Sequence, residues 1–355
     1  MTSPQQSQHL VVSDDLVVED LLLGTLDLVR EGGGWVAPGT RLIAERGHLR
    51  INSEATSGPL LRIPVHLWVR VDRVTWGFTD ERLEVVDVPD DIGEFELPML
   101  YLQTALHNAC GKLGWLSITH PSLASDVPDP IIVATRALIP SFRAHPPDAV
   151  DALFANRCFR IPAAPGETPQ RMLIPLVDLL NHHTSGAAGS WDGNAFCVDA
   201  RQPFDSDECA LDYGLRRDAM EMAVVYGFID TSATIAHSAP VVVDMSGGTR
   251  LQVMNDARDT DGSLVPINAN ANGDVMSVNR LTFSSDDPDG TVQDLAAVTG
   301  WDAPHARVAV AAIARANISL VDALIKACAD APDIRAATIL GEAALVQRSV
   351  VEVLA

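Results

Sequence analysis

The sequence predicts an α+β protein in which short strands and helices occupy different parts of the chain. Residues 35–76 form short β-rich runs separated by Gly and Pro, which is typical of short strands. From about residue 293 the chain is rich in alanine, with apolar residues at helical spacing. With 355 residues and 47% hydrophobic content, the chain can bury a large core, and two domains are expected.

The first half of the chain opens with nine polar residues that we expect to be frayed. Residues 14–34 (DDLVVEDLLLGTLDLVREGGG) predict a helix, because their apolar residues recur at helical spacing and a glycine run follows. After the β-rich stretch, residues 86–98 form an acidic connection. Residues 97–115 (LPMLYLQTALHNACGKLGW) predict a second helix, and residues 120–150, with six prolines, predict loops and short helices.

The second half begins with the apolar run LIPLVDLLNHHT at residues 173–184. The segments after it are predicted as a Gly/Ser loop (184–194), a strand (195–200), a helix (216–228), two strands (241–247 and 251–255), a polar loop (256–275) and three helices (292–300, 303–329 and 332–355). The composition shifts after about residue 230, which indicates a domain boundary there.

The formal net charge of −22 excludes one class of function and favours one class of partner. A nucleic-acid binder would carry basic stripes, and the sequence has none. The acidic surface favours basic partners, although the two lysines against 23 arginines indicate a high-GC bacterial genome as its main cause. We expect no membrane partner, because we find no apolar run of about 18 residues. Without a secretory signal, a cytoplasmic location is expected.

The five cysteines predict neither a disulfide framework nor a zinc cluster, because their number is odd and no two are spaced C-x-x-C. We expect reduced, mostly buried thiols. The adjacent pair His182–His183 lacks a third ligand at suitable spacing, so no metal is expected. The chain also lacks a Walker A loop, a GxGxxG fingerprint after a strand, and a G-x-S-x-G nucleophile elbow.

The polar residues that end the apolar run form the first candidate site. Asp178, Asn181 and His182 are three and four positions apart, so on a helical turn they would share one face. Such a face offers the donors and acceptors that adenine and ribose require. The alternative is a helix end with a polar cap.

Two Tyr-Gly pairs and one arginine complete the candidates. Tyr213 and Tyr226 flank the predicted helix in LDYGLRRDAMEMAVVYGFID, where a phenol can orient an amine and a ring face can stabilise a cation. The alternative is two core tyrosines. Arg157 lies between apolar residues in FANRCFRI, so it either contacts an anion or lies on an exposed strand edge.

These motifs, in this order, resemble SET-domain methyltransferases, in particular the branch of the Rubisco large-subunit lysine methyltransferase and the actin-histidine methyltransferase. The resemblance rests on NRCFRI, LIPLVDLLNHH and LDYGLRRDAMEMAVVYGFID, which lie within residues 154–230. The stretch GTRLIAERGHLRINSEATSGPLLRIPVHLWV is similar to the N-terminal hairpins of that branch, and GEAALVQRSVVEVL is similar to its last helix.

The resemblance implies a SET domain over residues 10–230, with short twisted sheets, a helical segment inserted at about 85–150 and a knot-like threading (pseudoknot) near Asn181 and Tyr213. It implies a mostly helical, substrate-binding-like domain over residues 231–355. S-adenosyl-L-methionine would be the cofactor. Its implied contacts are Arg157, Asp178, Asn181, His182 and Phe228, with Gly47 and Leu49 from the hairpin, and the implied catalytic residues are Tyr213 and Tyr226.

The implied activity is methyl transfer to a nitrogen, a lysine amine or a histidine imidazole, of a protein or peptide. Two departures from the family pattern keep alternatives open. The front motif reads RGHLRI in place of E-G-x-G-L, and the segment from 85 to 150 is shorter and richer in proline. The alternatives are a SET-fold enzyme that methylates a small-molecule metabolite, and a SET-like protein that binds without catalysis.

Overall fold

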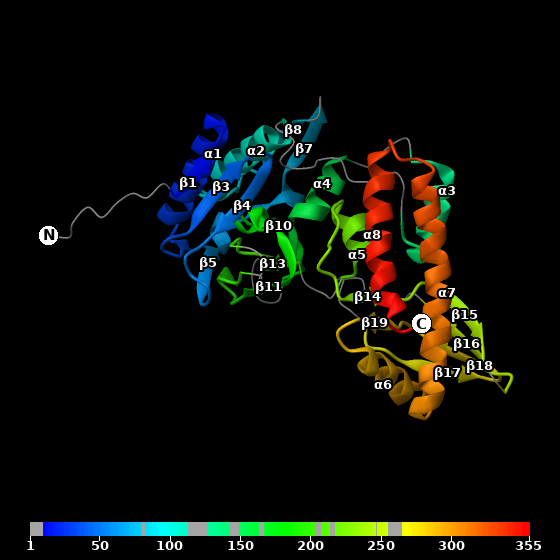
Figure 1. Cartoon of the computed structure of the whole chain (residues 1–355). Helices are drawn as coiled ribbons and strands as arrows, with labels where there is room; N and C mark the ends of the chain where they lie inside the picture. Colours follow the sequence, from blue (N-terminus) through cyan, green and yellow to red (C-terminus); the bar gives the residue numbers. More distant parts are fainter. Residues whose placement is uncertain are drawn as a thin grey trace. The chain divides into compact units, whose positions relative to one another are not determined.

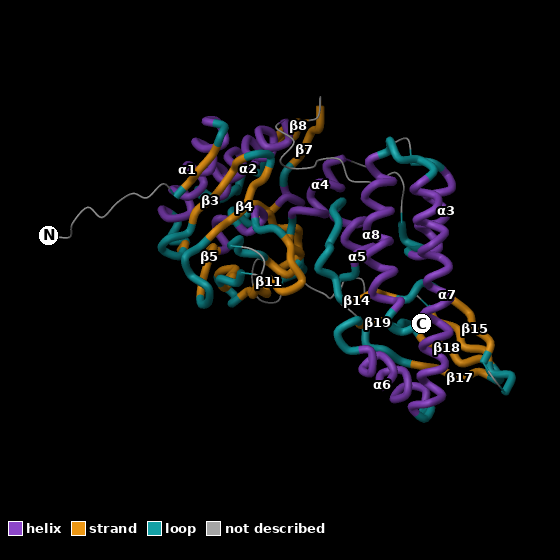
Figure 2. The backbone as a smooth tube through the Cα atoms, in the orientation of Figure 1, coloured by secondary structure: helices purple, strands orange, loops and turns teal. Residues whose placement is uncertain are grey.

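The computed structural model describes residues 10–79, 82–112, 127–142, 149–162, 167–202, 207–213, 217–245, 247–254 and 265–355. Within these residues the chain forms a mixture of helices and small sheets (Figures 1 and 2). The α+β prediction is therefore confirmed at this coarse level. The pseudoknot and the separate helical domain stay predictions.

The chain divides into two compact units. Unit 1 comprises Met1–Ile118 and Pro147–Gly214, and unit 2 comprises Thr119–Pro146 and Leu215–Ala355. The helix that was predicted to close the first domain before residue 230 thus lies in unit 2, together with part of the predicted insertion. The domain bounds predicted from the sequence, 10–230 and 231–355, therefore differ from these two units and stay a prediction.

Unit 1 is built from small sheets and three helices among its described residues. The helices are α1 (Leu16–Glu31), α2 (Glu96–Lys112) and α4 (Ala149–Arg157). The strands are β1 (Val11–Ser13), β2 (Trp35–Val36), β3 (Arg41–Glu45), β4 (His48–Asn52), β5 (Pro59–Pro64), β6 (Val69–Arg70), β7 (Thr75–Thr79), β8 (Arg82–Asp87), β9 (Phe159–Ile161), β10 (Gln170–Leu173), β11 (His182–Trp191), β12 (Ala195–Asp199) and β13 (Leu211–Asp212). Short 3-10 turns cover Val65–Leu67, Val71–Arg73 and Val177–Leu179.

The strands of unit 1 pair in four sheets. Their orders are β1-β3-β4, β6-β10-β9, β13-β11-β12-β5-β2 and β7-β8. β13 runs parallel to β11, and the pairing shifts register between His182 and Ala187, so that the chain bulges there. A bulge inserts extra residues and redirects neighbouring side chains.

The predicted Gly/Ser loop at 184–194 is wrong for most of its length, because residues up to Trp191 belong to β11. The glycines are packing residues here. A Cβ at Gly186 would lie 2.6 Å from the backbone nitrogen of Asp212, and one at Gly189 would lie 2.3 Å from the ring of Phe196. Close approach between neighbouring chains, which only glycine permits, explains a composition that otherwise indicates a loop.

Helix α1 follows the prediction closely. The Asp15 carboxylate accepts hydrogen bonds from the N–H groups of Val17 and Val18, which caps the first turn. The helix ends at Gly32, where the chain turns into the predicted glycine run. Val18, Leu22, Leu26 and Val29 are buried at helical spacing.

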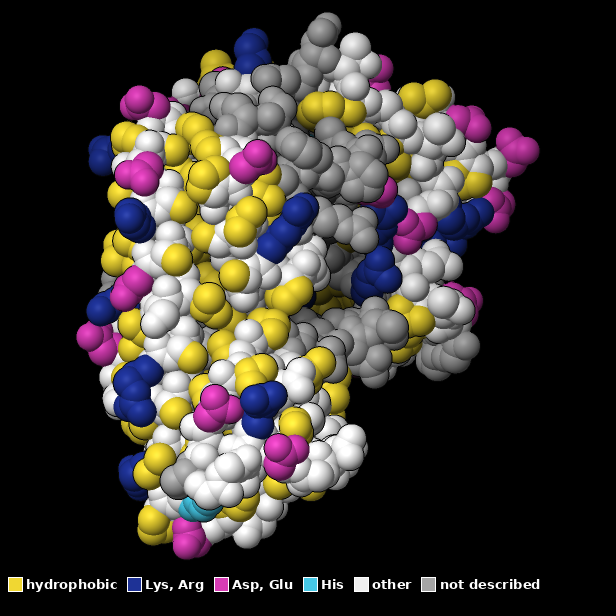
Figure 3. Space-filling view, turned by 90° about the vertical axis from the view of Figure 1, so that its right-hand side faces the viewer, with side chains coloured by type: hydrophobic (Ala, Val, Ile, Leu, Met, Phe, Trp, Pro, Cys, Tyr) yellow, Lys and Arg dark blue, Asp and Glu magenta, His cyan; other side chains and the backbone are white. Residues whose placement is uncertain are grey.

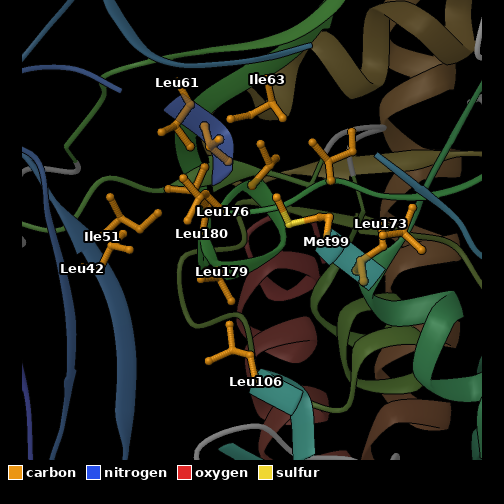
Figure 4. Packing of buried hydrophobic residues seen from close by; sticks show 14 of the residues in the cluster. Leu42, Ile51, Leu61, Ile63, Met99, Leu106, Leu173, Leu176, Leu179 and Leu180 are labelled. Carbon is orange, nitrogen blue, oxygen red and sulfur yellow. The ribbon is translucent and has the colours of Figure 1, made fainter. Parts of the chain in front are cut away.

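The core of unit 1 contains the apolar run at residues 173–180. Leu176, Leu179 and Leu180 lie between the β3–β4 hairpin, which contributes Leu42 and Ile51, and α2, which contributes Met99 and Leu106 (Figure 4). The run is therefore buried on several sides, and its polar neighbours are fixed by the packing of this core.

Unit 2 combines helices with two small sheets. The helices are α3 (Asp129–Leu138), α5 (Ala219–Tyr226), α6 (Pro288–Thr299), α7 (Ala303–Ala329) and α8 (Arg335–Glu352). The strands are β14 (Ile235–His237), β15 (Val241–Asp244), β16 (Arg250–Val253), β17 (Ala269–Asn272), β18 (Val275–Val278) and β19 (Thr282–Ser284). The sheet orders are β14-β19 and β15-β16-β18-β17. The predicted polar loop at 256–275 contains β17, while its residues 256–264 lie outside the described part.

The core of unit 2 is formed largely by α7 and α8, which pack along each other, with α3 and α6 against α7 (Figure 1). By length and composition, α7 is apolar enough to cross a membrane. However, 39% of its apolar 18-residue stretch is buried inside the protein. The expectation of no such stretch therefore does not hold for α7. One helix of this kind is weak evidence, because core helices of soluble proteins pass the same test.

The five cysteines form no disulfide in this structure, and Cys110, Cys209 and Cys328 are buried, while their reduced state stays a prediction. Charged side chains on the face drawn in Figure 3 are scattered among apolar ones, with acidic and basic groups interspersed. On that face the net charge does not gather into a patch of a single sign.

Candidate functional site

The turn that carries Asp178, Asn181 and His182 is not a helix, so the prediction of a shared helical face is wrong. Leu176 has φ of 65°, and only Val177–Leu179 forms a 3-10 turn before the chain becomes extended at Leu180. β11 then begins at His182. The burial of the apolar side chains around the turn outweighs the local helical spacing, and the three polar residues point to different partners.

Asn181 ties its turn to two other segments of unit 1. Its side-chain amide donates to the carbonyl of Leu49 at 2.9 Å and to the carboxylate of Glu208 at 2.6 Å. Its backbone carbonyl accepts from the N–H of Leu211 at 2.9 Å. Burial raises the pKa of Glu208, and the hydrogen bond from Asn181 opposes that rise. Both amide hydrogens are used within the protein, so the Asn181 side chain joins its turn to Leu49 and to Glu208.

His182 and Tyr213 form a second contact between the same segments. The backbone N–H of Tyr213 donates to Nδ1 of His182 at 3.1 Å, and the two ring centroids lie 5.1 Å apart. The Tyr213 hydroxyl donates to the carbonyl of Leu180 at 2.8 Å. Because Nδ1 accepts, a neutral His182 carries its proton on Nε2. The structure thus brings Tyr213 together with Asn181 and His182, although Tyr213 lies 31 residues after His182 in the chain.

Leu49, on the hairpin of β3 and β4, contacts Asn181, whereas Gly47 lies in the turn of that hairpin. Arg46 and Gly47 have φ of 52° and 79°, and Glu45 pairs with His48, so the two residues form a tight hairpin turn of positive φ. Leu49 is buried and its carbonyl meets Asn181. Gly47 shapes the turn that places this strand.

Asp178 faces the interior of unit 1. Its side chain is 0% exposed, and Oδ2 lies 3.4 Å from Nε2 of His107, which is on α2. Apart from this approach to His107, neither carboxyl oxygen has a polar partner among the described residues. Burial raises the pKa of Asp178 to about 7, while the nearby Arg157 guanidinium opposes the rise. As a direct contact to a cofactor, Asp178 stays a prediction, and this structure closes its carboxyl off from solvent.

Arg157 is the last residue of α4, so the alternative of an exposed strand edge is wrong, and the strand begins at Phe159. The Nη1 group of Arg157 donates to the backbone carbonyl of Asp178 at 3.4 Å. Arg157 therefore contacts the turn that carries the other candidates. Its predicted contact with a cofactor remains untested.

His107 and Glu208 are site neighbours that the sequence did not reveal. His107 lies on the buried face of α2, where a histidine is most often a satisfied core residue, and its partner lies 71 positions later in the chain. Glu208 follows Asp207 in an acidic stretch that reads as solvent-exposed. A buried histidine within an apolar helical face was the available signal for His107.

Tyr226 and Phe228 belong to unit 2. Tyr226 is the last residue of α5, and Gly227, with φ of 74°, ends the helix. The rings of Tyr226 and Phe228 have centroids 6.1 Å apart, and the guanidinium of Arg217 lies 5.5 Å from the Tyr226 centroid. The predicted grouping of Tyr226 and Phe228 with Tyr213 stays a prediction. Gly214, the glycine of the first Tyr-Gly pair, lies outside the described residues.

A buried network fixes the start of α5. The Asp218 carboxylate accepts from the N–H of Glu221 at 2.7 Å, from the N–H of His237 at 2.8 Å and from the amide of Gln347 at 3.0 Å. Burial raises the pKa of Asp218, and the Glu221 carboxylate raises it further. Asp218 thus ties α5 to β14 and α8 within unit 2, which holds the helix that presents Tyr226.

Among the described residues, no group of three or more His, Cys, Asp or Glu side chains is arranged to hold a metal ion. The N–H of Ser185 donates to Nδ1 of His183 at 2.9 Å. His182 and His183 therefore direct their rings to different partners, as expected for adjacent residues of a strand.

Comparison with known proteins found matches among solved structures. No family model matches the sequence, and no curated protein matches it. The crystal structure of the SET domain of LSMT bound to lysine and AdoHcy is similar with a TM-score of 0.43 and 11% sequence identity. The likeness covers 94% of this chain and 90% of that one. At this TM-score it carries no argument about the chemistry of this chain.

Proposed function

We propose that this protein is an S-adenosyl-L-methionine-dependent methyltransferase of the SET-domain type, which methylates a nitrogen of a protein or peptide, either a lysine amine or a histidine imidazole. The convergence of Leu49, Asn181, His182 and Tyr213 carries the proposal. These residues come from three separate stretches of chain. Asn181, His182 and Tyr213 also lie in the motifs on which the resemblance to SET-domain methyltransferases rests, whereas Leu49 lies in the front motif, which departs from the family pattern.

The polar groups around Asn181 fit a nucleoside. Arg50 and Asn52 alternate along β4 with the buried Leu49 and Ile51, so they share the opposite face of the strand. Nε of Arg50 and Oδ1 of Asn52 are buried without hydrogen-bond partners among the described residues. Buried polar atoms without partners are uncommon in proteins, and a nucleoside supplies both a donor and an acceptor. Arg50, Asn52, Asn181 and His182 would therefore hold the cofactor.

S-adenosyl-L-methionine, when bound, supplies a methyl group on a sulfonium sulfur. The protein then has to bring a nucleophilic nitrogen into line at short range. A lysine amine has a pKa of about 10.4 and must first lose its proton, which apolar and aromatic surroundings favour by disfavouring the charged form.

Tyr213 suits the task of orienting that nitrogen. Its hydroxyl donates a hydrogen bond to the Leu180 carbonyl, which fixes the position of the phenol oxygen. A phenol oxygen is also a hydrogen-bond acceptor, which suits the N–H of an amine. Such a bond aims the nitrogen lone pair away from Tyr213 and towards the methyl group. Fixing the hydroxyl in advance lowers the entropic cost of this alignment.

Two other functions use the same residues. A small-molecule metabolite is the alternative acceptor, favoured by the proline-rich segment at 85–150 in place of a longer helical insertion. A binding protein without turnover is the other alternative. Basic acceptors are favoured by the net charge of −22.

One labelling experiment separates these functions. Cell extract is incubated with the protein and methyl-labelled S-adenosyl-L-methionine, and macromolecules are then separated from small molecules. Label in protein that is lost with the Tyr213→Phe variant supports the proposed function. Label confined to small molecules supports the metabolite alternative. Saturable binding of S-adenosylhomocysteine without transfer of label to any fraction supports the binding protein.

A further inference from the structure

The buried pair of His107 and Asp178 lies behind the turn that carries Asn181 and His182. The side chains are 5% and 0% exposed, and Nε2 of His107 lies 3.4 Å from Oδ2 of Asp178. The other ring nitrogen of His107, Nδ1, lies 2.7 Å from the carbonyl of Gln103. A carbonyl only accepts, so Nδ1 carries a hydrogen and Nε2 is the nitrogen that faces Asp178.

The proton between these side chains has two possible positions. If Asp178 is protonated, its O–H donates to Nε2 of a neutral His107. If His107 is doubly protonated, the two form a buried ion pair, which carries a desolvation cost for both charges. Burial, helped by the positive charge of Arg157, lowers the pKa of His107 to about 4. Burial also raises the pKa of Asp178 to about 7, so the neutral pair is favoured.

The elements packed around Asp178 supply its other titratable neighbours. Helix α2 contributes Cys110, whose pKa burial raises to about 12, with Arg157 opposing and Asp178 adding to the rise. Arg157 closes α4, and Cys158 follows it, with a pKa that burial raises. Strand β4, which packs against the turn, carries His48 and Arg50. Among these groups, Arg157 is the cation that acts on the Asp178 carboxyl.

We propose that His107 is a positioning residue, which holds Asp178 as a neutral carboxylic acid, and that this pair fixes the turn at residues 177–182 from behind. The carboxyl acts on the ligand site through the turn and does not touch the ligand. Ionisation of Asp178 would leave a buried carboxylate facing the lone pair of His107, which loosens the turn. The consequence for cofactor affinity rests on the proposed function, whereas the arrangement of the turn does not.

The arrangement is tested without any ligand. Nitrogen NMR of the His107 ring at pH 6 is expected to show Nδ1 protonated and Nε2 bare. Hydrogen exchange of the amides of Asp178, Leu179 and Leu180, which are bonded within the turn, reports its order. We expect His107→Leu to speed this exchange about tenfold, because the acid loses its acceptor, and His107→Gln to restore most of the protection. His66→Gln, which removes an exposed histidine of the same unit, serves as the control.

A second experiment measures the dissociation constant of S-adenosylhomocysteine between pH 6 and pH 9. If the ligand needs the ordered turn, its affinity falls above about pH 7, by up to tenfold per pH unit. Asp178→Asn mimics the neutral acid, so it retains the affinity seen at pH 6 and removes this pH dependence. Asp199→Asn, on the exposed side of β12, leaves both unchanged. His107→Leu weakens the affinity at pH 6, because the turn is no longer held from behind.

Three results would overturn the proposal. They are a doubly protonated His107 at pH 6, unchanged exchange in His107→Leu, and a loss of affinity of tenfold or more at pH 6 in Asp178→Asn. The last would identify an ionised Asp178 that binds the cofactor directly. If S-adenosylhomocysteine does not bind at all, the proposed function fails, and the NMR and exchange measurements still decide whether the pair orders the turn.

Discussion

The hydroxyl of Tyr213 donates a hydrogen bond to the backbone carbonyl of Leu180 at 2.8 Å, while the N–H of the same tyrosine meets His182. The residue proposed to orient the methyl acceptor therefore also closes the turn that carries Asn181. Any substitution of Tyr213 acts on both tasks, and the two effects have different sizes.

Tyr213→Phe keeps the ring and removes the hydroxyl. The loss of one hydrogen bond to Leu180 is expected to lower the free energy of unfolding by about 0.5–1.5 kcal/mol. Turnover is expected to fall by about 10²-fold or more, because the acceptor nitrogen loses its alignment. Chemical denaturation and single-turnover kinetics measure the two effects. Tyr101→Phe, on an exposed position of α2, is the control. Unchanged turnover would move the proposed role to Tyr226.

Asn181→Ala removes both donors that join the turn to Leu49 and Glu208. We expect the affinity for S-adenosylhomocysteine to weaken by about 1–3 kcal/mol, with a loss of stability of similar size, because a buried carbonyl is left without its donor. Calorimetry and denaturation measure these changes. Asn272→Ala, on an exposed strand end of unit 2, should alter neither. A variant that keeps full affinity would show that Asn181 has no part in the site.

Gly186 has no room for a side chain beside β13. A Cβ there would lie 2.6 Å from the backbone of Asp212 and Leu211. Gly186→Ala should displace β13 and with it Tyr213, at a cost of about 1–3 kcal/mol, and it should reduce turnover. Gly93→Ala, where the nearest atom lies at an ordinary 3.6 Å, is the matched control. Equal stability of the two variants would contradict the close pairing of β11 and β13.

The pair of His107 and Asp178 gives a distinctive pH dependence of stability. The raised pKa of Asp178, from 3.8 to about 7, makes stability fall as pH rises through that window. The lowered pKa of His107, from 6.5 to about 4, makes stability rise with pH between those values. Between about pH 4 and 6.5 the two slopes oppose each other, so the pair contributes little net change.

Single substitutions should expose each slope. Relative to the unaltered protein, Asp178→Asn should gain stability as pH rises from 4 to 6.5, and His107→Gln should lose it, each by up to about 1.4 kcal/mol per pH unit. Denaturation at a series of pH values measures these differences. Curves that run parallel to the unaltered protein in both variants would mean that neither group titrates as described.

Several features of the fold were predictable because their causes are local. The helix of Leu16–Glu31 follows from its apolar spacing, its Asp15 cap and the glycine run. The strand Ala195–Asp199 follows from its composition. The turn at Asp178 was misread as helical, because its three-four spacing is local while the burial of Leu176 and Leu180 depends on strands and a helix far away in sequence.

The residues of the candidate site were likewise predictable from local motifs, but their distant contacts were not. Asn181, His182 and Tyr213 were identified by motif, and the structure brings them together. The contact between His107 and Asp178 depends on how α2 packs against the turn, which no local pattern encodes. β11 was misread because Gly186 and Gly189 indicate a loop until the close approach of β13 and Phe196 is known.

Isothermal titration of the protein with S-adenosylhomocysteine is the sharpest test of whether the residues around Asn181 bind the cofactor. We expect saturable binding with one ligand per chain, weakened in Asn181→Ala and unchanged in Asn272→Ala. The absence of binding at millimolar ligand, or equal binding by both variants, would contradict it.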